Sequence, residues 1–217
     1  MKDFSVVMAL VDFIPVVLFA VAAIMLQRDL YNKMSKGAFS LFAAGTIDAI
    51  FAGSSKALYK LLYAAGICDF QPLNSLYFPV ISVGFLLAGL GLVGMLTHKQ
   101  SEKGESIISD KAAFGLVAPV AYNGTVIMIC FMVSGLAMIY IVLGVLARRL
   151  KKPVIIAVLA FSYICALCMG YLASKDFNEA IWNWIAQVIN ILGQGTLLLS
   201  VIVMRRAGLT KLEIKRR

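Results

Sequence analysis

Four amide side chains recur along one face of an apolar stretch, WNWIAQVINILGQG, which runs from Trp182 to Gly195. Steps of four, three and four residues separate them, and such steps place one amide on the same helical face at each turn. Amides within hydrocarbon need partners, which either a wet cavity or a neighbouring helix supplies. We favour the cavity, because four amides in register exceed what one helix contact needs. A polar or zwitterionic solute would then bind at Asn183, Gln187, Asn190 and Gln194.

Three charged residues also fall inside apolar runs, namely Asp12, Asp48 and Lys56. A lone charge at the bilayer centre costs at least about 2.5 kcal/mol on insertion scales, so pairing is expected. Asp12 and Lys56 should lie at similar depth, and we predict an ion pair between them. Asp48 has no obvious basic partner, which leaves two interpretations: a proton-coupling site or a structural carboxyl bonded to a neighbour. We expect Asp48 and Tyr77 to face the amides across the solute site.

Cysteine offers an alternative chemistry, because Cys165 and Cys168 form a C-x-x-C pair on one apolar run. Thiol oxidoreductases of membranes carry such pairs, but two cysteines on one helical turn are poorly placed to bridge each other. Cysteine is also often buried as a small apolar residue. One histidine and four scattered cysteines predict no metal site. No catalytic triad and no nucleotide or dinucleotide motif is present, so no catalytic residue and no cofactor is expected.

The elements that must hold these residues are membrane helices. The chain has 217 residues, of which 61% are hydrophobic and only 14% charged, and its mean hydropathy is +0.91. Soluble domains are about 45–50% apolar and about 25% charged. Runs of about twenty apolar residues suffice to cross a bilayer. We therefore predict an all-α polytopic membrane protein with spans over residues 5–26, 38–63, 76–97, 106–122, 125–147, 153–173 and 180–204.

The net charge of +9 reflects basic segments at the ends of these spans, over residues 27–37, 98–111, 148–152 and 205–217. Basic residues mark the cytoplasmic side, so the charge predicts contact with anionic lipid head groups and no nucleic-acid partner. All four segments lie inside only if the chain also crosses between residues 106 and 122. This gives seven helices in a 3-1-3 order with a short fourth helix. The N-terminus is then outside an inner or plasma membrane, and the C-terminus is cytoplasmic.

The 3-1-3 order suggests one transmembrane domain over 1–217, with halves 1–98 and 125–206 joined by a linker helix, 106–122. The halves would be parallel three-helix repeats. In helix count and orientation the layout resembles SWEET-type sugar transporters and seven-helix microbial rhodopsins. The Pro-Gln dipeptide of the PQ-loop relatives of the first family is missing. The last span carries Asn190 where rhodopsins carry their retinal-linking lysine, so retinal is not expected.

Together these features predict a small transporter, or a transporter-like binding protein, for a small polar solute, with proton coupling through Asp48 as one mode. Its partners would be membrane lipids and one small-molecule ligand. Two alternatives stay open. One is an integral membrane enzyme, acting either on thiols through Cys165 and Cys168 or on lipids, and the other is a seven-helix receptor. We favour a protein that is not an enzyme.

Overall fold

A computed structural model describes residues 5–97, 125–172 and 180–212, and these residues form helices and turns without any strand. Within these ranges, five segments are long and apolar enough to cross a membrane. The prediction of an all-helical architecture is thereby confirmed for the described residues, and the apolar helices fit a membrane protein. The predicted span 106–122 lies outside the described residues. The helices are α1 (Val6–Val11), α2 (Phe13–Leu30), η1 (Tyr31–Lys33), α3 (Lys36–Ala64), α4 (Gln71–Ser75), α5 (Tyr77–Thr97), α7 (Thr125–Arg149), α8 (Pro153–Leu172), α9 (Ala180–Arg206) and η3 (Leu209–Lys211).

Local sequence signals explain where these helices begin and end. Ser35 caps α3, because its hydroxyl accepts a hydrogen bond from the Ala38 backbone N–H at 3.3 Å. Pro153 opens α8, a position where the missing N–H costs nothing. Glycines with positive φ follow two of the helices, at Gly66 (φ 68°) after α3 and Gly208 (φ 97°) after α9. Short connections join α2 to α3 and α7 to α8, so the helices of these two pairs pack side by side.

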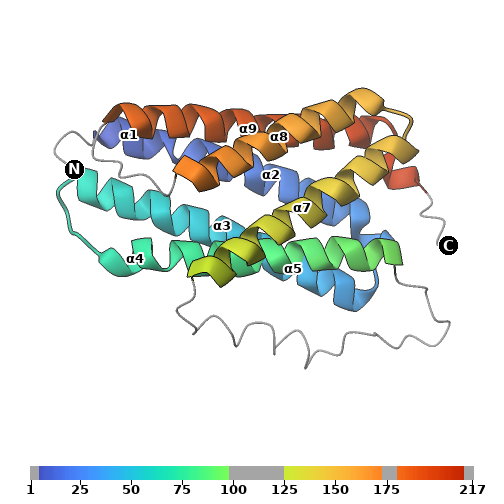
Figure 1. Ribbon diagram of the computed structural model, residues 1–217, viewed down its shortest axis with the longest axis horizontal. Coiled ribbons are helices and arrows are strands. Elements are labelled where there is room, and N and C mark those ends of the chain that lie inside the picture. The colour runs from blue at the N-terminus through green and yellow to red at the C-terminus, as the bar shows by residue number, and fades with distance from the viewer. Residues whose placement is uncertain (1–4, 98–124, 173–179, 213–217) are drawn as a thin grey trace.

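Six of the described helices pack in a ring in the chain order α2, α3, α5, α7, α8 and α9, and α9 closes it by packing on α2. Figure 1 shows their directions: α2, α5, α7 and α9 run one way along the bundle, whereas α3 and α8 run the other way. Each half of the described chain thus contains a helix, an antiparallel helix and a third helix parallel to the first. The four amides lie together on α9, whereas Asp48 lies on α3 and Tyr77 on α5.

Glycines bring neighbouring helices of the ring into close contact. A Cβ added at Gly91 of α5 would lie 2.6 Å from the Ala38 carbonyl oxygen of α3. One added at Gly89 would lie 2.7 Å from the carbonyl oxygen of Gly135 on α7. Without a solvent-driven hydrophobic force in lipid, such small residues allow the backbone contact that holds membrane helices together. These glycines therefore fix α5 between α3 and α7.

Most basic side chains of the described helices lie at one end of the bundle, where α2, α7 and α9 end and α3 and α8 begin (Figure 1), whereas Lys56 and Lys60 lie near the other end of α3. Lys33 donates hydrogen bonds from Nζ to the carbonyl oxygens of Thr210 and Leu212, at 3.0 and 2.7 Å. Arg205 of α9 lies 3.6 Å from Asp29 of α2, whose side chain is 1% exposed. We call this the basic end of the bundle.

The main hydrophobic core fills the middle of the bundle and the half next to the basic end. All six ring helices contribute, for example Leu26 of α2, Leu92 of α5, Leu143 of α7 and Val201 of α9. Leu209 of η3, which follows α9, is completely buried and covers this core at the basic end. Asp12, Lys56, Lys60 and the first amides of α9 lie toward the opposite end, which we call the polar end.

Candidate functional site

The amide stripe of α9 turns toward the bundle. Asn183 and Gln187 are buried, with 8% and 3% of their surface exposed, and Asn190 and Gln194 are half-buried. The apolar side chains between them are exposed on the other face, as the 53% exposure of Val188 shows. The helix α9 packs against α2 and α8. The amides consequently point into the protein, where their polar atoms need partners.

Gln187 reaches the backbone of the first span. Its Nε2 donates a 2.7 Å hydrogen bond to the carbonyl oxygen of Met8, the last turn of α1. The same carbonyl accepts the Asp12 backbone N–H at 3.3 Å. Asp12 separates α1 from α2, and Pro15, which has no N–H, cannot donate to the carbonyl of Val11. Gln187 therefore contacts the α1–α2 junction, where Asp12 keeps helical backbone angles and the two helices form one continuous segment, Val6–Lys33.

Two side-chain oxygens of the stripe lack hydrogen-bond partners among the described residues. They are Oε1 of Gln187 and Oε1 of Gln194, and both atoms are fully buried. Leaving a buried acceptor unpaired costs about 1–3 kcal/mol. Natural proteins tolerate few such groups, and each calls for an explanation such as a bound water or ligand. Both oxygens can accept a hydrogen bond from a donor that enters the bundle.

A cluster of charges lies on the other side of the α1–α2 junction. Lys60 of α3 contacts Asp12 with 2.6 Å between Nζ and Oδ2, and these side chains are 18% and 15% exposed. Lys56, one turn earlier on α3, places its Nζ 4.1 Å from the centre of the Tyr77 ring. The predicted Asp12–Lys56 pair is therefore wrong, and Asp12 pairs with Lys60. Both lysines lie at the same end of α3, but only Lys60 points at α2.

Asp48 lies apart from the amides. It is half-buried on α3, and a Cβ added at Gly84 of α5 would lie 3.0 Å from its Cβ. This position is the contact between α3 and α5, whereas the amide stripe of α9 packs on α2 and α8. Within the described residues its carboxylate has no ion-pair partner. The structure thus joins Tyr77 to Lys56, and it places Asp48 and the amide stripe at different helix contacts.

The C-x-x-C pair has two unlike surroundings. Cys165 is buried, Cys168 is exposed, and neither forms a disulfide. The Cβ of Cys165 would lie 2.9 Å from a Cβ added at Gly193, so this cysteine fills the contact between α8 and α9. Its small size suits this close approach. Within the described ranges, no group of three or more His, Cys, Asp or Glu side chains is placed to hold a metal ion.

Sequence patterns alone missed several polar links between helices, among them one through Ser162 and one through Asp29. The hydroxyls of Tyr140 on α7 and Ser162 on α8 lie 2.7 Å apart, and Ser162 donates a 2.7 Å hydrogen bond to the Gly193 carbonyl of α9. Because Ser162 gives its proton to that carbonyl, Tyr140 is the donor between the two hydroxyls. The second link is the Asp29–Arg205 pair at the basic end. An acidic residue inside a basic segment was the available signal for it.

The Gly193 carbonyl accepts the hydrogen bond of Ser162, and Gly193 directly precedes Gln194. The relay of Tyr140, Ser162 and Gly193 therefore anchors α9 next to Gln194, the last amide of the stripe. The candidate site is therefore built from the α1–α2 junction, the amide face of α9 and the α7–α8–α9 relay. Comparisons with protein families, with curated proteins and with solved structures find no match to this chain.

Proposed function

We propose that this chain is a small transporter, or a transporter-like binding protein, for a small polar solute that donates hydrogen bonds. The observation that carries the proposal is the pair of buried, unpartnered oxygens on α9, Oε1 of Gln187 and Oε1 of Gln194. Amides that only hold two helices together would have their oxygens hydrogen-bonded to the neighbouring helix, because those bonds are what stabilises the contact. Hydroxyl, amide or ammonium groups of a solute would supply the missing donors.

The arrangement of the core supports a site that is reached from the polar end. Apolar side chains fill the middle and the basic end, as Leu92 and Leu143 do with 0% exposure. Asn183, Gln187 and the Asp12–Lys60 pair all lie toward the polar end. A solute from that side would meet polar groups first and reach the closed core last. The state described here would then be open toward the polar end.

We further propose seven crossings in a 3-1-3 order within a cell membrane, with the N-terminus outside and the C-terminus cytoplasmic. Figure 1 supports the seventh crossing, because α5 ends at the basic end and α7 starts at the polar end. Thr97 and Thr125 thus lie at opposite ends of the bundle, as a further crossing between them requires. Gathering of the basic side chains at one end favours a cytoplasmic position for that end.

Parallel three-helix repeats also fit the ring. A twofold axis along the bundle would exchange α2 with α7, α3 with α8, and α5 with α9, and it would convert each packed pair of the ring into another packed pair. Transporters built from parallel repeats bind their substrates at the interface between the halves. Here the contact of α2 with α9 is such an interface, and Gln187 lies on it.

Asp48 is the residue that we propose for proton coupling, if transport is active. It is half-buried near the middle of α3, and within the described chain no basic group pairs with it. Asp48→Asn should abolish solute-driven proton movement in proteoliposomes and preserve solute binding. Unchanged proton movement in this variant would remove Asp48 from the proposal.

Gln194→Met gives the decisive test, because it keeps the size of the side chain and deletes the unpartnered acceptor. The purified protein is first screened against small polar metabolites by thermal unfolding. A ligand at a hundred times its Kd should stabilise the protein by about 2.7 kcal/mol, or about 5–10 °C in Tm for a chain of this size. Gln194→Met should unfold no earlier than the original protein without ligand, and it should lose the ligand shift.

Thr196→Val is the matched control on the same helix, since the Thr196 hydroxyl bonds only carbonyls of its own helix, those of Leu192 and Gly193. It should retain the ligand shift. Asn190→Leu, near the middle of α9, should fold and lose binding as Gln194→Met does. If Gln194→Met instead lowers the Tm by several degrees and spares the ligand shift, the amides serve helix packing and the transport proposal fails.

A further inference from the structure

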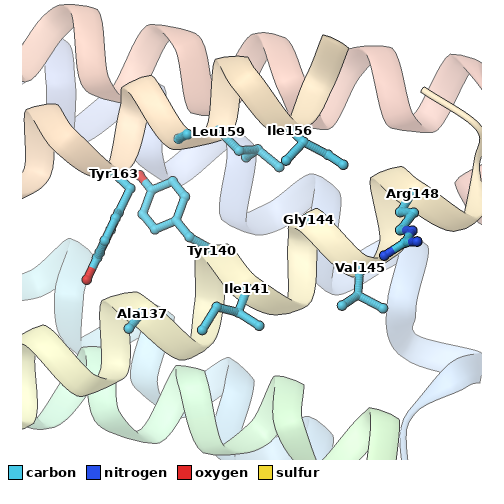
Figure 2. A pocket seen from close by; sticks show the side chains of 10 residues that line it. Ala137, Tyr140, Ile141, Gly144, Val145, Arg148, Ile156, Leu159 and Tyr163 are labelled. Carbon is cyan, nitrogen blue, oxygen red and sulfur yellow. The ribbon is translucent and has the colours of Figure 1, made fainter. Parts of the chain in front are cut away.

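A cleft between α7 and α8 is separate from the amide stripe. Its volume is about 500 Å³, and its walls are almost entirely apolar. Figure 2 shows it from close by, with Tyr163 at one end and Arg148 at the other. Its lining also includes Ile141, Val145 and Ile156. These residues belong to helices that span the membrane, so the cleft opens at the depth of the lipid acyl chains.

The charge of the cleft is confined to one mouth. Arg148 lines that mouth in the last turn of α7, at the basic end of the bundle. Arg149, Lys151 and Lys152 follow directly, and all four basic side chains are exposed. A long apolar groove with a guanidinium at its membrane-surface end matches an amphiphile with an apolar tail and an anionic head. Basic pockets between membrane helices on the cytoplasmic side bind anionic lipid head groups in this way.

We propose that this cleft is a binding site for an anionic membrane phospholipid, with one acyl chain between α7 and α8 and the phosphate on Arg148. The acyl chain gains little by leaving the bilayer for the cleft, because both surroundings are apolar. Selectivity therefore comes from the head group. A basic residue near the membrane surface contributes about 1 kcal/mol toward an anionic lipid, which corresponds to about a fivefold preference.

Gly144 makes the site testable, because it lines the cleft and a Cβ added there would meet no atom within 4 Å. A large side chain at this position would enter the space of the acyl chain without displacing protein atoms. Gly144→Phe therefore blocks the tail, whereas Arg148→Gln removes only the charge at the mouth. Ala44→Phe is the matched control, since Ala44 is a small exposed residue on α3, away from α7 and α8.

The experiment uses the full chain in bilayers with two photo-crosslinking lipids that share the same diazirine-labelled acyl chain. One is phosphatidylglycerol and the other is phosphatidylcholine. After irradiation, labelled peptides are mapped by mass spectrometry. Peptides of α7 and α8 that line the cleft should carry about five times more phosphatidylglycerol than phosphatidylcholine. Arg148→Gln should reduce this ratio to about one, and Gly144→Phe should remove the label for both lipids.

Ala44→Phe should leave label and ratio unchanged, and Gly144→Ala, which adds one methyl group in open space, should retain most of the label. Equal labelling by the two lipids in the original protein would overturn the proposal. So would an unchanged ratio in Arg148→Gln, or an original protein whose cleft peptides take no label because another part of the chain covers them. None of these outcomes affects the solute site on α9.

Discussion

Replacing Lys60 by Met should destabilise the protein by about 2 kcal/mol. The Nζ atom of Lys60 lies 2.6 Å from Oδ2 of Asp12, and both side chains are more than four-fifths buried. Exposed ion pairs contribute about 0.2–1 kcal/mol, whereas removing one partner of a fully buried pair costs about 3–5 kcal/mol. The Asp12–Lys60 pair lies between these limits because it retains some contact with the surface.

The pairing itself is measured by a double-mutant cycle of Asp12→Asn and Lys60→Met. Each single change strands a charge or a polar group, whereas the double change removes both. We expect the double variant to lose about 2.5 kcal/mol, which gives a coupling of about 1.5 kcal/mol, within the range of residues in direct contact. The free energy of unfolding is read from a denaturant titration in mixed micelles, and each single variant should lose about 4–8 °C in Tm.

Lys56→Met provides the control, because Lys56 is one turn away and its Nζ lies over the Tyr77 ring at 4.1 Å. Its coupling to Asp12→Asn should be weaker than that of Lys60→Met, because Lys56 acts on Asp12 electrostatically but makes no ion-pair contact with it. The reasoning is refuted if Lys56 couples to Asp12 by more than 1 kcal/mol while the losses from Asp12→Asn and Lys60→Met are additive. Depth in the membrane, rather than the direction of each side chain, would then choose the partner.

Three further outcomes are expected. Gly91→Ala should lower the free energy of unfolding by about 1–3 kcal/mol, because its Cβ would lie 2.6 Å from the backbone of α3. Gly144→Ala should be neutral or stabilise the protein by up to about 1 kcal/mol, because its Cβ meets no other atom. Equal losses in the two variants would contradict the glycine contact. Ser162→Ala should cost about 1–3 kcal/mol, since it strands the Tyr140 hydroxyl and removes one of the hydrogen bonds to the Gly193 carbonyl. An unchanged Tm would argue against the relay. Single cysteines introduced at Lys33 and Lys151 should react with membrane-impermeant reagents only from the cytoplasmic side, and labelling of Lys151 from outside would disprove the proposed topology.

The helices of this protein could be predicted from the sequence, because each depends on residues near one another in the chain. Apolar runs of about twenty residues placed the membrane helices, and the structure confirms an all-helical chain with several segments able to span a membrane. The regular spacing of Asn183 and Gln187 also predicted one shared face, and both side chains are buried. The third span contains several glycines, which allow close helix packing, and Gly91 lies against α3.

Partners across helices depended on the tertiary structure. Lys56 and Lys60 are one turn apart, so depth alone could not choose between them, and the rotation of α3 against α2 selected Lys60 for Asp12. Gln187 found a backbone carbonyl, that of Met8, which no side-chain pattern marks. The separations between helices are set by glycine contacts from distant parts of the chain. For this reason the sequence determined which residues turn inward, and only the packed bundle decided which of them meet.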